Sequence, residues 1–222
     1  MAKTAILVDG GFYRKKMEKG LPHTPTEAAD ALITYCFRHL DERHMQHELY
    51  RIFYYDAPPC GKKIFHPLHN RTFDLSKSDY YKWMVDFLKE LTKKRKLALR
   101  LGAIDEGSAS YILTNSATKD IIRGNRTLES LTDKDFVPSL KQKGVDMKIG
   151  MDIASMAYKK QVEQIVLIAG DADFVPAAKL ARREGIDFVL DPLSAPIKPD
   201  LFEHIDGMRS CGNPFQKAKG NK

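Results

Sequence analysis

Residues 164–176 read QIVLIAGDADFVP. The aliphatic and β-branched run over residues 164–169 predicts a strand that is buried on both faces, as strands of parallel sheets are. Residues 174–184 then predict a helix, which Gly185 ends. Asp171 and Asp173 lie directly after the strand, the position at which open parallel sheets bind their ligands. This stretch therefore predicts an α/β protein with an acidic site at the carboxyl edge of its sheet.

The rest of the chain repeats this alternation of short apolar strands and longer amphipathic helices. The pattern predicts strands at residues 5–8, 48–55, 97–104 and 186–190, helices at residues 26–44, from 76 and at 147–160, and a short helix or edge element at 200–205. A mostly parallel sheet with helices on both faces is the fold that this order favours.

Composition is that of an ordinary globular protein, with 43% apolar and 29% charged residues among 222. The net charge of +7 favours a polyanionic partner. Three widely spaced cysteines, with no histidine at zinc-ligand spacing, predict neither a disulfide framework nor a structural zinc site. No apolar run is long enough for a membrane span, and the start of the chain does not resemble a signal peptide. We therefore expect a cytoplasmic protein without membrane contact.

One domain is expected over residues 1–212. The polar stretch near residues 105–142 interrupts the alternation and predicts an insertion or a lid that carries short elements of its own. Residues 213–222 hold three lysines and little to bury, which predicts a basic flexible tail.

A second carboxylate, Asp9, follows the strand at residues 5–8 and precedes two glycines. If this strand neighbours the one at residues 164–169, Asp9 converges with Asp171 and Asp173 on one spot. Like charges this close repel each other unless protons or a cation neutralise them. The sequence therefore predicts a site for a hard divalent metal ion.

Asp146 and Asp152 are two further candidates: Asp146 precedes the helix predicted at residues 147–160, and Asp152 lies within it. Six residues at 100° each place them about 120° apart on a helix, so both join one site only if Asp146 precedes the helix proper. Alternatively, Asp146 and Asp173 are helix caps and Asp152 is a structural hydrogen-bond acceptor.

These motifs resemble the NYN domain, a branch of the PIN-like nucleases. The resemblance rests on Val8-Asp9-Gly10, on Lys143-Gly144-Val145-Asp146 with Asp152, and on residues 168–176, IAGDADFVP. Residues 58–142 match only in general layout. Many relatives have Asn three residues after the first Asp, where this chain has Phe12.

The resemblance implies a three-layer α/β/α fold and metal-dependent hydrolysis of RNA phosphodiester bonds. Carried onto this chain, it implies catalytic roles for Asp9, Asp146, Asp152, Asp171 and Asp173. Asp9, Asp146 and Asp171 are the expected ligands of Mg²⁺ or Mn²⁺, which would bind phosphate oxygens and deliver a hydroxide to the phosphorus atom.

The expected partner is RNA, single-stranded or structured, and a homo-oligomer is left open. Phosphate contacts are expected from basic residues near the acidic motif and in the insertion, namely Lys143, Lys148, Lys119, Arg123 and Arg126.

Rival functions have weaker support. A phosphatase with a nucleophilic Asp9 would need a second acid where Gly11 stands, and neither glycine fingerprint of nucleotide-binding folds occurs. His66 and His69 flank a proline in a turn-like region without partners at diagnostic spacing. The main alternative is a catalytically silent module of the same fold that binds RNA or protein.

Overall fold

A parallel sheet runs through the centre of the computed structural model, which describes residues 2–17, 24–42 and 45–212. Its order is β13 (Gly207–Met208), β12 (Asp187–Asp191), β11 (Gln164–Ile168), β1 (Ala2–Asp9), β3 (Met45–Asp56) and β6 (Leu97–Leu101), all parallel. The short β2 (Asp41–Glu42) adds an antiparallel pairing at the start of β3. The mostly parallel sheet expected from the sequence is confirmed.

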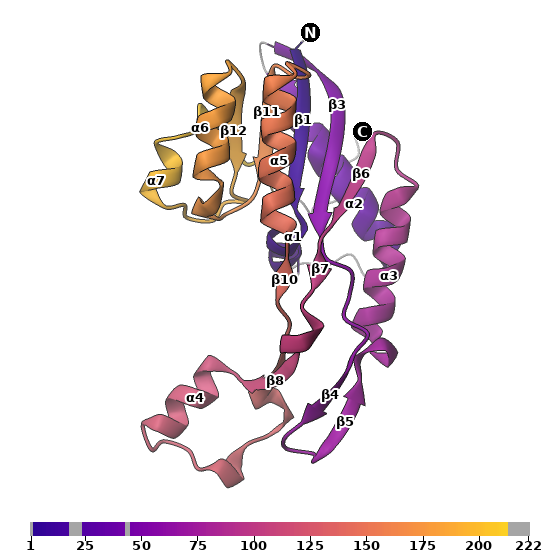
Figure 1. The fold of residues 1–222 in the computed structure, drawn as a ribbon, viewed down its shortest axis with the longest axis vertical. Coiled ribbons are helices and arrows are strands. Elements are labelled where there is room, and N and C mark those ends of the chain that lie inside the picture. The colour runs from indigo at the N-terminus through magenta and orange to yellow at the C-terminus, as the bar shows by residue number, and fades with distance from the viewer. Residues whose placement is uncertain (1, 18–23, 43–44, 213–222) are drawn as a thin grey trace, which may run out of the picture.

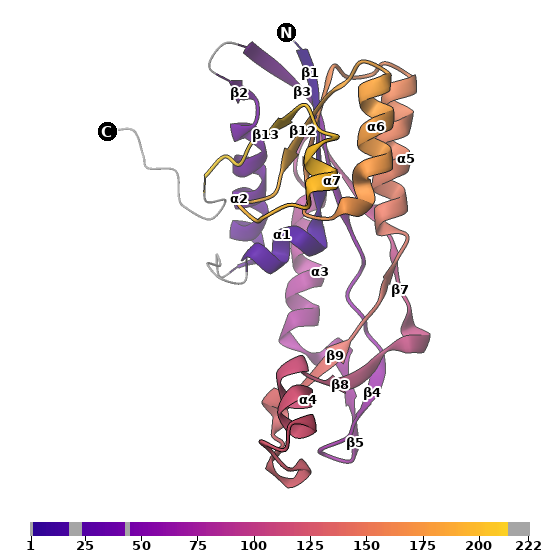
Figure 2. The ribbon, with the colours of Figure 1, turned by 90° about the vertical axis from the view of Figure 1, so that its left-hand side faces the viewer.

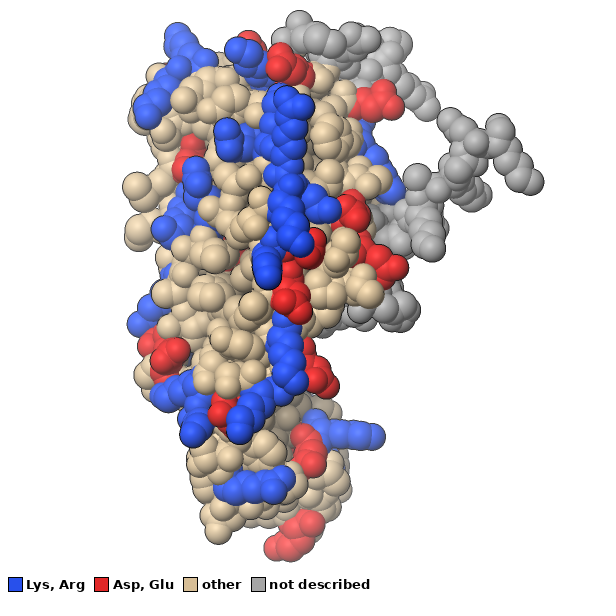
Figure 3. Space-filling model, turned by 90° about the vertical axis from the view of Figure 1, so that its right-hand side faces the viewer, with Lys and Arg blue, Asp and Glu red and all other residues tan. Residues whose placement is uncertain are grey.

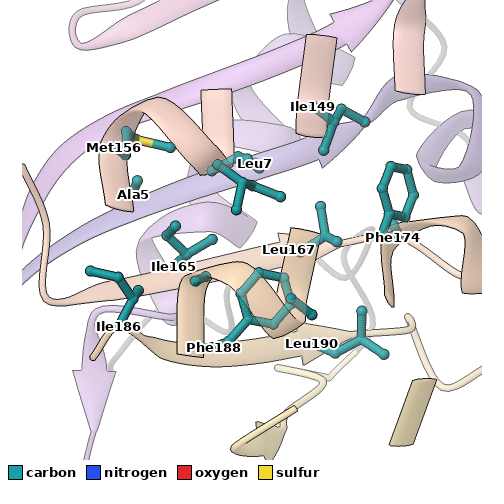
Figure 4. Packing of buried hydrophobic residues seen from close by; sticks show 14 of the residues in the cluster. Ala5, Leu7, Ile149, Met156, Ile165, Leu167, Phe174, Ile186, Phe188 and Leu190 are labelled. Carbon is teal, nitrogen blue, oxygen red and sulfur yellow. The ribbon is translucent and has the colours of Figure 1, made fainter. Parts of the chain in front are cut away.

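Strand β1 lies at the centre because it is apolar on both faces. Ala5 and Leu7 pack into one hydrophobic cluster, and Ile6 and Val8 pack into another on the opposite face. All four side chains are fully buried. Figure 4 shows the first cluster, in which Leu7 and Leu167 lie beneath Ile149 of the covering helix.

Helices cover both faces of the sheet and make three layers (Figures 1 and 2). The first cluster is covered by α5 (Val145–Tyr158), α6 (Val175–Arg183) and α7 (Pro199–Phe202). The second is covered by α1 (Gly10–Met17), α2 (Pro25–Arg38) and α3 (Asp79–Thr92). The α/β/α fold implied by the resemblance is confirmed.

Local capping fixes where the helices begin and end. The Thr24 side chain and Glu27 form a capping box at the start of α2, and Ser78 accepts a hydrogen bond from the Tyr81 N–H at the start of α3. The helix expected over residues 26–44 ends earlier, at Arg38, because the chain then enters β2. Helix α1, which directly follows β1, was not predicted.

An arm extends from the sheet along the long axis of the molecule (Figure 1). We define it as residues 63–77 and 103–143. Its elements are β4 (Lys63–His66), β5 (Arg71–Asp74), η1 (Leu75–Lys77), β7 (Ala103–Ile104), η2 (Glu106–Ser108), β8 (Ser110–Leu113), α4 (Asn115–Ile122), η3 (Leu128–Ser130), η4 (Asp133–Asp135), β9 (Phe136–Ser139) and β10 (Gln142–Lys143). Strands β4 and β5, β8 and β9, and β7 and β10 form antiparallel pairs.

The strand expected over residues 97–104 is divided at Gly102. A Cβ atom there would lie 2.5 Å from the Lys143 carbonyl oxygen, so the close approach of the two chain segments at the base of the arm requires glycine. A role of the arm as a lid stays a prediction. The predicted basic tail, residues 213–222, lies outside the described residues.

None of the helices in the described residues combines the length and the apolar character that crossing a lipid bilayer requires.

A substitution at Gly10 tests the packing between the start of α1 and β3. A Cβ atom at Gly10 would lie 2.5 Å from the Asp56 carboxylate and 2.6 Å from the Tyr54 ring, and both of these side chains are buried. We expect Gly10→Ala to lower the free energy of unfolding by about 1–3 kcal/mol through overpacking. Denaturant unfolding followed by circular dichroism measures this effect.

Gly150→Ala is the matched control, because no atom of the described residues outside the backbone of α5 itself lies within 4 Å of a Cβ atom built there. We expect this change to raise the free energy of unfolding by about 0.5–1 kcal/mol. Equal effects of the two substitutions would contradict the packing described around Gly10.

Candidate active site

Asp9 and Asp171 lie close together because the strands that precede them, β1 and β11, are neighbours in the sheet. Val8 of β1 lies opposite Ile168 of β11 in the parallel register, so Asp9 at the end of β1 and Asp171 after β11 share one edge of the sheet. They line a pocket of about 590 Å³. The pocket is lined by Asp9, Gly11, Phe12, Arg14, Lys15, Tyr80, Leu140, Gln142, Val145, Asp146, Gly170 and Asp171.

Asp9 is half-buried and lines the pocket, and its carboxylate accepts a hydrogen bond of 3.1 Å from the Phe12 N–H. Burial raises the pKa of Asp9, and the charge of Asp146 raises it further. The Phe12 N–H opposes this shift because it stabilises the charged form, and the positive charge of Arg14 opposes it as well. Asp9 is therefore held in place by the backbone that follows it, in an environment unfavourable to negative charge.

Asp146 lies in the first turn of α5 and is exposed at the pocket. Partial desolvation raises the pKa of Asp146, and the charges of Asp171 and Asp173 raise it further. These interactions link the carboxylates from β1, α5 and the turn after β11 into one acidic group.

Asp173 lies within the short 3₁₀ helix η5 (Ala172–Phe174), and Asp171 directly precedes it. Asp171 caps this short helix, since its carboxylate accepts a hydrogen bond of 3.2 Å from the Asp173 N–H. The alternative role of Asp173 as the N-cap of the next helix is not seen, because Phe174 is the N-cap of α6. Asp173 is exposed and does not line the pocket, although its charge reaches Asp146.

Asp152 lies outside this pocket. Because Asp146 is already on the helix, the separation of six positions turns Asp152 to another face of α5. Its carboxylate accepts a hydrogen bond of 2.8 Å from the Tyr55 hydroxyl and another of 2.9 Å from the Arg100 Nε. The structure thus shows Asp152 in the alternative role, as a structural acceptor, and does not bring it into the predicted site.

Asp56 is a fully buried carboxylate that the sequence analysis missed. It forms an ion pair with Arg14 and accepts a hydrogen bond of 3.1 Å from the Gln142 amide and one of 2.8 Å from the Ala57 N–H. Ligands bind at the carboxyl ends of parallel strands, which is why Asp9 was a candidate, and Asp56 has the same position at the end of β3. Asp56 is neutralised by Arg14, and its contacts position two residues that line the pocket.

The basic side chains at the pocket are also not those that the sequence predicted. Arg14 and Lys15, both from α1, line it. Lys143 pairs with Asp105, with 2.9 Å between Nζ and Oδ2, and Lys148 is exposed on α5 outside the pocket lining.

The three basic residues predicted in the insertion lie on the arm, around α4 at its far end (Figure 1). Lys119 and Arg123 are exposed. Arg126 donates two hydrogen bonds, of 2.8 and 2.9 Å, to Asp135, so its guanidinium is engaged within the arm. The structure does not place these residues at the acidic pocket.

Phe12, which stands where many relatives have Asn, contacts the glycine after β11. A Cβ atom at Gly170 would overlap the Phe12 ring. The ring therefore occupies the space beside Asp9 and Asp171 and requires glycine at position 170.

The acidic residues fit a hard divalent cation. Among the described residues, no Lys or Arg forms an ion pair with Asp9, Asp146 or Asp171. Oxygen ligands suit Mg²⁺, which usually keeps several waters and is held by one or two carboxylates together with substrate phosphates. The pocket is therefore suited to an ion that its carboxylates hold in part through water.

Three comparisons place the chain among known proteins. A model of the NYN domain matches residues 84–197, a little more than half of the chain, including Asp146 and Asp171. The uncharacterized protein MJ0482 of Methanocaldococcus jannaschii is 23% identical over 105 residues, and the match covers 44% of each protein, so less than half of that relative's length. A solved structure of a protein of unknown function, VPA0982 of Vibrio parahaemolyticus, has a TM-score of 0.48 at 13% identity over 96% of this chain and 95% of the other.

The raised pKa of Asp146 predicts how its negative charge affects the stability of the metal-free protein. A carboxyl whose pKa is raised by folding stabilises the fold below its unfolded pKa, about 3.9, and this contribution disappears as the pH rises through the folded pKa. We therefore expect Asp146→Asn to raise the melting temperature in EDTA at neutral pH by about 1–3 °C. The gain over the parent should shrink as the pH falls toward 4.

Asp152→Asn is the matched control on the same helix, because Asp152 is paired with Arg100 and Tyr55. We expect this substitution to lower the melting temperature at neutral pH. Thermal melts of both variants against pH measure the effects. A drop in the stability of Asp146→Asn would show that Asp146 is a structural residue.

Proposed function

The chain belongs to the NYN domain family, a family of PIN-like nucleases, and from this premise we propose that it is a metal-dependent endoribonuclease. The observation that supports the proposal most strongly is the convergence of Asp9, Asp146 and Asp171 in one pocket, where no Lys or Arg of the described residues pairs with them. Carboxylates that repel one another are unfavourable in a fold unless an ion or substrate compensates for them.

Mg²⁺ or Mn²⁺, when bound there, would polarise a phosphate oxygen and supply a hydroxide at neutral pH. The chain's own residues would hold and orient the reactants. The Asp9 carboxylate is held by a hydrogen bond from the Phe12 N–H, and the Asp171 carboxylate is held by one from the Asp173 N–H. Both can therefore bind the ion or its waters without first being ordered.

RNA would enter over the residues that line the rest of the pocket. Lys15 is exposed there and could neutralise a phosphate, while Arg14 is held against the wall by Asp56. Tyr80 from α3 is 55% exposed and lines the pocket, so its ring offers a surface for stacking an unpaired base. These residues favour a single-stranded segment as the substrate.

The charge distribution suits an RNA partner. Figure 3 shows Lys and Arg side chains in a column along the long axis of one face, with fewer acidic side chains among them. Together with the net charge of +7, this column would offer a track for a phosphate backbone.

Cleavage of RNA by carboxylate variants tests the proposal. We expect Asp146→Asn and Asp171→Asn each to lower the cleavage rate of a single-stranded RNA in Mn²⁺ by about 100-fold or more, the scale of removing one group that stabilises charge at a reacting centre. Excess EDTA should abolish cleavage by the parent. Asp200→Asn, an exposed change on α7, is the control and should retain full activity.

A silent binding module would give another pattern. The parent would then bind RNA without cutting it in Mg²⁺ or Mn²⁺. Cleavage that persists in EDTA, or that is equal in all variants, would contradict the metal mechanism.

The salt dependence of RNA binding locates the side chains that neutralise phosphates. Each phosphate of a single strand that a cationic side chain neutralises adds about 0.7 to the steepness of log K against log salt. We expect Lys15→Ala to reduce the steepness by about that amount, and Lys119→Ala with Arg123→Ala to reduce it by about 1.4 if RNA reaches the arm. Fluorescence anisotropy with the Asp171→Asn protein measures binding without cleavage.

Arg126 is left unchanged in this experiment because it pairs with Asp135 within the arm. An unchanged slope in the double variant would exclude the end of the arm from the RNA track, and an unchanged slope in Lys15→Ala would exclude Lys15.

A further inference from the structure

The arm holds a second cluster of metal-ligand side chains, separate from the acidic pocket. His66 ends β4, His69 lies in the turn to β5, and Asp133 begins η4. A ligand atom from each lies within 4.8 Å of the others. The His69 Nε2 and an Asp133 carboxylate oxygen are 2.5 Å apart. We propose that these three side chains bind Zn²⁺.

His66 supplies an independent reason to expect a ligand. Its side chain is buried, with 5% exposed, and its Nδ1 has no hydrogen-bond partner among the described residues. A buried ring nitrogen without a partner is unfavourable. A metal ion is a natural partner for a neutral imidazole nitrogen.

Neighbouring aromatic rings hold His66 in position. Its ring centroid lies 4.3 Å from that of Tyr111 and 5.2 Å from that of Phe136, on the paired strands β8 and β9. Phe73 of β5 packs against it at 5.4 Å. Ligands fixed by packing before binding are typical of built metal sites.

Asp133 is positioned by the turn that follows it. Thr132 and Asp135 form a capping box around η4, and Asp135 accepts two hydrogen bonds from Arg126. These hydrogen bonds order the backbone of η4, from which the Asp133 carboxylate contacts His69. Arg126 and Asp135 therefore help to position Asp133.

The donor atoms favour Zn²⁺ over the hard ion proposed for the acidic pocket. Two imidazole nitrogens with one carboxylate suit a transition metal, whereas Mg²⁺ prefers oxygen ligands alone. Three protein ligands leave a fourth tetrahedral position for water. The ion would join the β4–β5 hairpin to the inserted segment and thereby fix the arm.

Direct titration tests the site. Untagged full-length protein, stripped with EDTA and dialysed, is titrated with Zn²⁺ in a competition with a chromophoric chelator, in millimolar Mg²⁺ to occupy the acidic pocket. We expect one tight site per chain and a higher melting temperature with Zn²⁺. Co²⁺ should give the visible absorption bands of a four-coordinate site that contains nitrogen ligands.

His69→Gln and Asp133→Asn should each weaken the tight site by about 100-fold or more and remove the Zn²⁺-dependent rise in melting temperature. Both side chains are partly exposed, so both variants should fold. His66→Phe keeps an aromatic ring in the packed cluster while removing the nitrogen, and it should abolish Zn²⁺ binding in the same way.

Two control variants test other places where Zn²⁺ could bind. Asp146→Asn with Asp171→Asn alters the acidic pocket, and Cys211→Ser alters a thiol 3.5 Å from the His39 Nδ1. Both should keep the tight site. Failure of either control to bind Zn²⁺, with binding retained in the histidine variants, would overturn the proposal, as would a parent protein that does not bind Zn²⁺ tightly. Neither result bears on RNA cleavage in Mg²⁺.

Discussion

Repulsion between carboxylates at one edge of a parallel sheet is the constraint around which the pocket is built. Neighbouring β1 and β11 bring Asp9 and Asp171 to that edge, and the start of α5 adds Asp146. Burial of both faces of the strands in hydrophobic clusters stabilises the fold against this repulsion. Burial of Asp9, partial desolvation of Asp146 and the charges of neighbouring carboxylates raise the pKa of both residues.

The surroundings of the pocket separate carboxylates that are neutralised from those that are not. Asp56 is paired with Arg14, and Asp152 with Arg100 and Tyr55. Among the described residues, no Lys or Arg lies within ion-pair distance of Asp9 or Asp146, although the charge of Arg14 lowers the pKa of Asp9 in part. This difference, more than the number of acidic residues, is what favours a cation site at the pocket, because a carboxylate paired with an arginine guanidinium is already neutralised.

The fold could be predicted from the sequence because strands buried on both faces appear as continuous apolar runs, and the acid after each run marks the sheet edge. The place of Asp152 could not be predicted, since it depends on whether Asp146 is in the helix or before it. The pairing of Asp56 with Arg14 and the joining of His66 with Asp133 could not be predicted either, because each brings together residues far apart in the sequence, the second pair within an arm that has no regular pattern.

The central claim is that Asp9, Asp146 and Asp171 together form a divalent cation site. Anomalous diffraction from a crystal soaked in Mn²⁺ measures this most directly, because it locates the ion without an assay. The account predicts a Mn²⁺ peak in the pocket within coordination distance of at least one of these carboxylates and bridged to the others by water. Density that is empty at this pocket in Mn²⁺, or a peak only at the paired Asp152, would contradict it.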